Sequence, residues 1–252
     1  MTPTDTRNPI VVTTEKVGRA AVAGIEEIGL GAMMVVESFY WLIFGRREKQ
    51  AVRLGAIAEQ CMAIGIQAVP IIALLAATIG MMLAIQGIHT LRIFGAESRV
   101  TVGISFSVVR EFAPLITGIV IAGRSGSALA ARIGTMKINQ AMVAMLIMVP
   151  ALTLFSDFVG LFFAGVYVNL DLGISLAAYM DQTIDLLSVD DLMHGLGKSV
   201  IFSVLIAVIG VVNGASVQGG AEGVGKATTR AVVQSISAII VTDMLFAFVV
   251  TR

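Results

Sequence analysis

The chain of 252 residues is far more apolar than a soluble protein, with 57% hydrophobic residues, 13% charged residues and a mean hydropathy of +0.92. Soluble domains average about 45–50% apolar and about 25% charged residues. The 17 basic and 17 acidic residues balance, which argues against the clustered basic surface of a nucleic-acid-binding protein. The single cysteine, Cys61, excludes an internal disulfide and a cysteine-based metal site. The composition therefore predicts an all-α integral membrane protein.

Residues 14–45 form the first apolar stretch, and charged residues interrupt it. At about 100° per residue, the charges fall within an arc of about 100°, which makes one polar stripe on an otherwise apolar helix. These charged residues are Lys16, Arg19, Glu26, Glu27 and Glu37. The pattern, followed by aromatic residues at 39–41, predicts an amphipathic helix in the membrane interface. A sixth crossing is the alternative, and it would reverse the predicted side of the N-terminus.

Five later stretches are long and apolar enough to cross a membrane, which takes about 20 residues. They are residues 61–86, 101–123, 141–168, 199–217 and 229–250. Lys and Arg gather before the first span, after the second, and between the fourth and fifth. Because cytoplasmic loops carry the excess of basic residues, the N-terminus is predicted in the cytoplasm. We interpret residues 172–195 as a short amphipathic outer helix or loop with a solvated acidic surface.

Charged residues inside the spans are the clearest functional signal. Arg110 and Glu111 are adjacent in the second span, and Asp157 and Asp243 lie singly in the third and fifth. A membrane charge is costly unless it is paired or hydrated. Since neighbouring helix residues point about 100° apart, Arg110 and Glu111 are not expected to pair with each other. Either aspartate is a candidate partner for Arg110, in a packing ion pair or at the mouth of a substrate pathway.

Two further patterns concern helix packing. After Pro114, small residues recur at every fourth position, which lets another helix approach closely and transmit a displacement along the row. The row consists of Gly118, Ala122, Gly126, Ala130 and Gly134. A single helix from Leu54 to Leu91 would be about 57 Å long against a hydrocarbon core of about 30 Å, so a tilt or a bend near Pro70 is expected.

Several motifs argue against an enzyme or a metal protein. Gly220, Gly225 and Lys226 nearly match a phosphate-binding loop, but Ala227 replaces the required hydroxyl residue and no strand precedes it, so a glycine turn is predicted. His89 and His194 stand apart from other ligand types, and no metal site is predicted. Because no nucleophile with an oriented base appears, we predict no catalytic residues.

Two long segments resemble the MlaE family of lipid ABC transporter permeases. They are VVREFAPLITGIVIAGRSGSALAARIGTMK at 108–137 and GGAEGVGKATTRAVVQSISAIIVTDMLF at 219–246. The resemblance implies an MlaE-type permease fold, a homodimer whose subunits each have an N-terminal interfacial helix and five crossings. It also implies separate cytoplasmic ATPase subunits that bind ATP and magnesium, and periplasmic lipid-binding MCE-domain subunits. Such systems move phospholipid between the bacterial inner membrane and carriers serving the outer membrane, and so maintain its lipid asymmetry.

The resemblance further implies a site. Leu83, Thr90 and Phe94 match residues that line a central lipid pocket near the dimer axis, and Arg110 and Glu111 match a charged pair close to it. ATP hydrolysis in the partner would change the shape of this pocket. The chain itself would then perform no covalent chemistry and hold no cofactor.

The sequence departs from the family after residue 140. Family members continue through an acidic amphipathic segment that seats the ATPase, whereas Gln140 here runs directly into AMVAMLIMVP. Lys137, Asn139 and Gln140 are therefore the residues assigned to ATPase coupling. A natural shortening, an engineered deletion and an omitted segment are all open explanations.

Two other functions stay open. A non-transporting structural membrane subunit is the strongest alternative, and ATP-dependent lipid flux would exclude it. A proton-coupled secondary transporter is the other, although such proteins often show repeated halves with broken helices, and five unlike spans do not.

Overall fold

The computed structural model describes residues 54–126, 138–215, 217 and 220–250, together with isolated helical positions at 15, 18, 22, 29 and 33. Within these residues every regular element is a helix, and five helical segments are long and apolar enough to cross a membrane. The predicted all-α class and the five crossings are confirmed. The predicted interfacial helix at 14–45 lies outside the described residues, apart from those isolated positions.

The first apolar stretch is divided into α2 (Leu54–Gly65) and α3 (Val69–Ile93). A turn at 66–68 separates them, and Pro70 occupies the first turn of α3. Proline is tolerated there because its missing N–H would have no partner within the helix. The predicted single long helix is therefore interrupted next to Pro70, and α3 alone, at about 37 Å, is long enough to span the bilayer.

The second span runs from Glu97 to Gly126 and changes helical type along its length. It consists of η1 (Glu97–Arg99), α4 (Val100–Ser107), η2 (Val108–Phe112), α5 (Ala113–Ile121) and η3 (Ala122–Gly126). Both η2 and η3 are π-helical turns. Such turns occur mostly within α-helices and are frequent at functional sites. Arg110 and Glu111 lie in η2.

The remaining helices are α7 (Ile138–Leu172), α8 (Leu176–Leu186), α9 (Val189–Ala215) and α10 (Gly220–Val250). The predicted short outer helix corresponds to α8, which Ser175 caps by accepting a hydrogen bond from the N–H of Ala178. However, α9 begins at Val189 instead of near residue 199. The prediction of a solvated acidic surface over 172–195 is therefore wrong for Asp191, which is 3% exposed.

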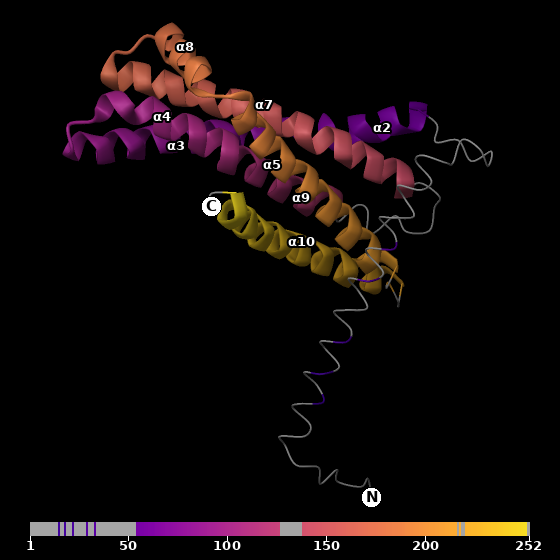
Figure 1. The fold of residues 1–252 in the computed structure, drawn as a ribbon. Coiled ribbons are helices and arrows are strands. Elements are labelled where there is room, and N and C mark those ends of the chain that lie inside the picture. Colours follow the sequence, from indigo (N-terminus) through magenta and orange to yellow (C-terminus); the bar gives the residue numbers. More distant parts are fainter. Residues whose placement is uncertain are drawn as a thin grey trace, which may run out of the picture.

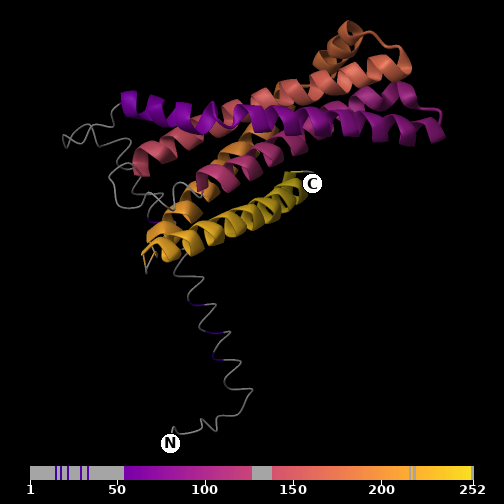
Figure 2. The same ribbon diagram turned by 180° about the vertical axis from the view of Figure 1, so that it is seen from behind.

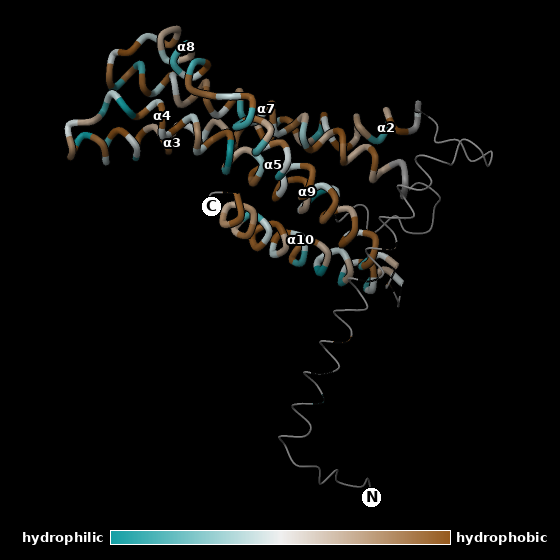
Figure 3. The backbone as a smooth tube through the Cα atoms, in the orientation of Figure 1, coloured by the Kyte–Doolittle hydropathy of each residue, from teal (hydrophilic) through white to brown (hydrophobic). Residues whose placement is uncertain are grey.

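Figures 1 and 2 show α3, α4 and α7 side by side, with α8 folded back at one end and α2 at the other. Helix α10 runs along α9 on one side of the bundle (Figure 1). In both views α9 begins, and α10 ends, part-way along α3 and α7. Hydrophobic residues predominate along the long helices (Figure 3), as expected for elements that face lipid and one another.

Close helix contacts depend on glycine. A side chain at Gly80 of α3 would collide with the carbonyl oxygen of Gly160 on α7. On α5, a Cβ at Gly118 would lie 3.1 Å from the ring of Phe202. Together with the fully buried Ala122 and the buried Gly126, this confirms the packing role predicted for the first part of the small-residue row. The later members, at 130 and 134, lie outside the described residues.

Candidate functional site

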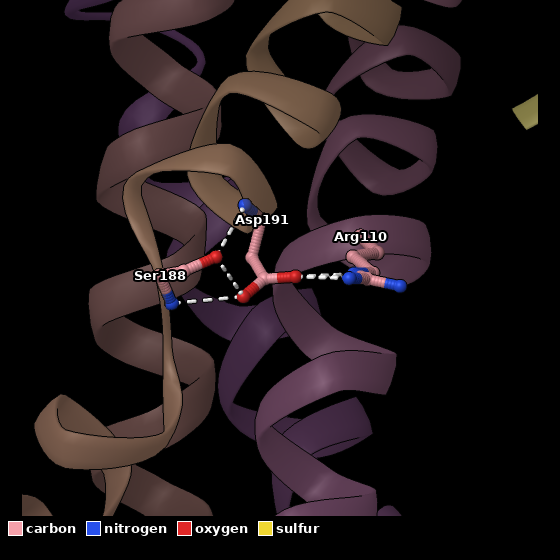
Figure 4. Close-up of polar contacts among 3 residues, drawn as sticks. All are labelled: Arg110, Ser188 and Asp191. Carbon is pink, nitrogen blue, oxygen red and sulfur yellow. Dashed lines mark hydrogen bonds and ion pairs between the residues drawn. The ribbon is translucent and has the colours of Figure 1, made fainter.

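A buried ion pair joins the π-turn η2 to the start of α9 (Figure 4). The Nε of Arg110 donates to Asp191 Oδ1 at 2.7 Å, and its Nη2 pairs with the same oxygen. Asp191 Oδ2 accepts from the backbone N–H of Ser188 at 2.8 Å and from its hydroxyl at 2.7 Å. Both oxygens of the carboxylate are therefore satisfied, as a buried charge requires.

Local sequence explains why α9 starts where it does. Ser188 precedes the helix, and its hydroxyl lies 3.3 Å from the N–H of Asp191, three residues later. The Asp191 carboxylate returns a bond to the Ser188 backbone. This reciprocal arrangement is the capping box, here with aspartate in place of glutamate. The Ser-x-x-Asp signal followed by an apolar run was present in the sequence, and it would have placed the helix start at residue 189.

A second set of charges lies about two turns further along α9. Lys198 is fully buried, and its Nζ contacts Glu111 Oε2 at 2.5 Å and Asp243 Oδ1 at 3.0 Å. The side chains of Glu111 and Asp243 are 39% and 17% exposed. A buried ammonium group is stable only with such partners. Sequence reasoning missed Lys198 because it was counted as lying outside the fourth span.

The adjacent residues Arg110 and Glu111 thus bind α9 at two separate positions. Asp191 and Lys198 are seven residues apart, so they lie on the same face of α9. The prediction that Arg110 and Glu111 do not simply pair with each other agrees with this geometry. The proposed partners of Arg110 are wrong, because Arg110 pairs with Asp191 while Asp243 pairs with Lys198. Asp157 makes no ion pair in the described part of the chain, and its Oδ1 has no hydrogen-bond partner there.

Gly195 allows the two helices to approach. A side chain at this position would collide with the backbone oxygen of Val109 in η2. Gly195 lies between Asp191 and Lys198 on the same helix, so this contact sets the distance across which both ion pairs form. The geometry of the charged residues therefore depends on a glycine as well as on the charges.

Aromatic rings border the charges. The ring of His194 stacks on Phe246 with centroids 5.0 Å apart, and Lys198 Nζ lies 5.6 Å from the centre of the same Phe246 ring. Arg110 lies 4.9 Å from the centre of the Phe106 ring. These contacts add a favourable cation–π interaction to the partly exposed Arg110 and to the buried Lys198. No group of three or more His, Cys, Asp or Glu residues suited to a metal occurs within the described residues.

The predicted lipid-facing residues of α3 lie in one row. Leu83, Thr90 and Phe94 are spaced by seven and four residues, which places them on one side of the helix axis. Leu83 is half-buried and packs against the core that contains Val108 and Val109 of η2. Thr90 is exposed, and Phe94, at the end of the helix, is 75% exposed. Of these three residues, only Leu83 packs against that core.

A separate apolar groove of about 790 Å³ lies between α3 and α7. It is lined by α3 residues between Ala73 and Ile85 and by Val159 and Phe163 of α7. Leu74, in this lining, is nine residues before Leu83 and therefore points to the opposite side of α3. The groove is distinct from the Leu83 row.

The starts of α7 and α10 lie towards the end of the bundle that is opposite α8 (Figure 1). Gly220 begins α10 with a φ of 68°, a left-handed conformation that suits glycine. The predicted glycine turn is wrong for Gly225 and Lys226, because both lie within α10, where Lys226 pairs with Glu222 at 2.7 Å. Asn139 and Gln140 lie in the first turn of α7, where only their backbone is described. Lys137 lies outside the described residues.

Comparison with known proteins gives a consistent result. The family model Permease MlaE matches residues 57–142 and 141–249, two pieces that meet where the family segment is missing. A probable ABC transporter permease protein of Rickettsia typhi is 29% identical over 257 aligned positions, covering 91% of this chain and 96% of the relative. Since 91% of 252 residues is about 229, about 28 of those positions face gaps in this chain.

Two other relatives are similar over most of their length. A probable ABC transporter permease protein of Synechocystis is 33% identical, covering 75% of this chain and 80% of the relative. The intermembrane phospholipid transport system permease protein MlaE of Haemophilus influenzae is 29% identical with the same coverage. The predicted resemblance is confirmed, and the chain belongs to the MlaE permease family.

Proposed function

We propose that this chain is the membrane-spanning permease subunit of an ATP-driven phospholipid transport system in a bacterial inner membrane, of the type that maintains outer-membrane lipid asymmetry. Family membership carries the proposal, because the Haemophilus influenzae relative is named as a phospholipid transport permease. Five apolar helices support a multi-pass membrane protein. ATP and magnesium would bind in a separate cytoplasmic ATPase subunit, and this chain would hold no cofactor.

The lipid would lie against the α3 row of Leu83, Thr90 and Phe94, near the axis of a homodimer. An amphipathic ligand requires an apolar surface that ends near a charge. Leu83 would supply the apolar part of this surface, because it packs against the core that contains Val108 and Val109, the two residues before Arg110. Thr90 and Phe94 extend the row towards the end of α3, and both side chains are exposed within the described residues.

Arg110 and Glu111 would face the lipid headgroup. Although both are salt-bridged, each side chain remains 39% exposed, whereas their α9 partners Asp191 and Lys198 are 4% and 0% exposed. The buried partners hold the charged groups in position, and the exposed edges can contact an anionic or zwitterionic headgroup. Such a division of roles is what a headgroup site at the edge of a bundle requires.

Partner subunits would cover the exposed apolar faces. Within the subunit only 11% of the most apolar window of α10 is buried, and Ile240, Met244 and Phe248 are more than half exposed. A second copy of the chain would provide a natural cover near the proposed axis. Periplasmic MCE-domain subunits would receive or deliver the lipid, as the family resemblance implies.

Lys137, Asn139 and Gln140 would contact the ATPase. The family match divides into two pieces directly after these residues, at 141–142. The interruption also favours a second candidate function, a structural membrane subunit that binds lipid without ATP-driven transport.

The test is purification of the chain with its genomic neighbours, followed by an ATPase assay and mass spectrometry of bound lipid. Leu83→Trp and Arg110→Ala should each lower bound phospholipid several-fold. Leu74→Trp is the matched control, because Leu74 is 68% exposed on the opposite side of the same helix, and it should retain wild-type lipid.

Phospholipid together with ATPase activity would support the transporter. Phospholipid without an associated ATPase would favour the structural candidate. Absence of both would contradict the proposal, as would equal lipid loss in Leu83→Trp and Leu74→Trp, because the row would then have no special role.

A further inference from the structure

Asp157 differs from the other buried charges of the protein. It lies near the middle of α7, its residue is 6% exposed, and its Oδ1 has no hydrogen-bond partner within the described residues. Asp191, Glu111 and Asp243 all contact a cation. Asp157 is thus a buried carboxyl group that the proposed lipid site does not use.

A dry gap adjoins the residue that precedes Asp157. Its neighbour Ser156 is fully buried, has an unpartnered hydroxyl and lines a gap between α3, η2, α5 and α7 that is too narrow for a water molecule. Gly80 and Gly160 line the same gap at the tight α3–α7 contact. Water therefore has no room at this gap to hydrate a charge beside it.

No free cation is found on the helices that pack against α7. Helices α4 and α5 carry no titratable residue at all. Among the cations of the other packed elements, Arg92 pairs with Asp171 and Glu97, Arg110 with Asp191, and Lys198 with Glu111 and Asp243. The other titratable residues of those elements and of α7 are Glu59, Cys61, His89, Tyr167, Tyr179, Asp181, Asp185, Asp190 and His194.

We propose that Asp157 is a neutral carboxylic acid in the folded protein. Its carboxyl group therefore takes up one proton when the protein folds. An ionised carboxylate without a cation or water is strongly disfavoured in a membrane interior. In the unfolded chain the group meets water and ionises above its ordinary pKa of about 3.9. The proton comes from solvent on folding and returns to solvent on unfolding.

Infrared difference spectroscopy tests the protonation state directly. The full chain in lipid nanodiscs at neutral pH should show the C=O stretch of a protonated carboxyl group, and this band should be absent from Asp157→Asn. Asp185→Asn is the matched control, because Asp185 is exposed on α8, and its difference spectrum should show an ionised carboxylate. A carboxylate signal from Asp157 would overturn the proposal.

The pH dependence of stability provides a second readout. The ratio of the wild-type to the Asp157→Asn folding equilibrium constant should fall by up to tenfold per pH unit above the ordinary aspartate range, since only the wild type takes up this proton. A ratio independent of pH would refute the proposal. Failure of Asp157→Asn to fold would also refute it, because a neutral isostere should be accepted. Neither readout requires lipid transport, so each is independent of the proposed function.

Discussion

Two helix contacts in this protein are built on opposite principles. The ionic interface joins η2 to α9 through the Arg110–Asp191 and Glu111–Lys198 pairs, in which one partner of each pair is more than a third exposed. The glycine interface joins α3 to α7 where Gly80 meets the backbone of Gly160. The glycine interface has no room for water. The ionic interface, in contrast, is partly exposed. We therefore expect α3 and α7 to move as one unit during transport, and α9 to move relative to η2.

The largest effect is expected at the buried centre of the ionic interface. Lys198→Met should destabilise the protein by about 3–5 kcal/mol, because it leaves Glu111 and Asp243 without their cation. Chemical denaturation in detergent measures this change. The double variant Lys198→Met/Asp243→Asn should recover part of the stability. If it does not, electrostatics is not what holds this contact.

At the glycine interface, Gly80→Ala should destabilise by about 1–3 kcal/mol, because the new methyl group would overlap a backbone carbonyl that cannot rotate away. Gly103→Ala on α4 is the control, since open space surrounds that position, and it should be neutral or stabilising. Thermal unfolding in the same detergent compares the two. Equal melting temperatures would show that the close α3–α7 contact is not required.

A smaller change is expected at the start of α9. Ser188→Ala should cost about 1 kcal/mol through the lost cap, and it should also lower phospholipid binding because Asp191 then holds Arg110 less firmly. Ser175→Ala removes the equivalent cap of α8, which carries no charged pair. It should lower stability by a similar amount and leave bound lipid unchanged. Lipid loss in both variants would contradict the positioning role.

The smallest effect concerns the outer helix. Tyr179 of α8 is fully buried, its hydroxyl has no hydrogen-bond partner in the described residues, and burial raises its pKa to about 12. Tyr179→Phe should therefore be neutral or stabilise by up to about 1 kcal/mol, because it removes an unsatisfied polar group. A destabilisation above that amount, measured by thermal unfolding, would reveal a partner for this hydroxyl.

Hydropathy and helical periodicity predicted the fold well because bilayer thickness restricts both helix length and composition. The five spans, the interruption next to Pro70 and the packing of Gly118 all follow from local rules. The start of α9 was missed because Asp190, Asp191 and Lys198 lower the hydropathy of its first turns. The detection of spans averages hydropathy over many residues. The charged residues that belong to the candidate site therefore make the start of the helix harder to see.

The pairing of charges could not be predicted in the same way. Arg110 and Asp191 are separated by 81 residues, and which aspartate meets the arginine depends on how η2 and α9 cross. The π-helical turn is itself not visible in residue periodicity, since it shifts the side chains by a fraction of a turn. Asp243 has a cation, and Asp157 has none among the described residues; this contrast likewise emerges only in three dimensions.

The most direct test of the central claim is phospholipid transfer from proteoliposomes that contain the purified chain with its ATPase and MCE-domain partners. The account predicts ATP-dependent transfer that Leu83→Trp reduces and Leu74→Trp does not. An intact complex that hydrolyses ATP without moving phospholipid would contradict it.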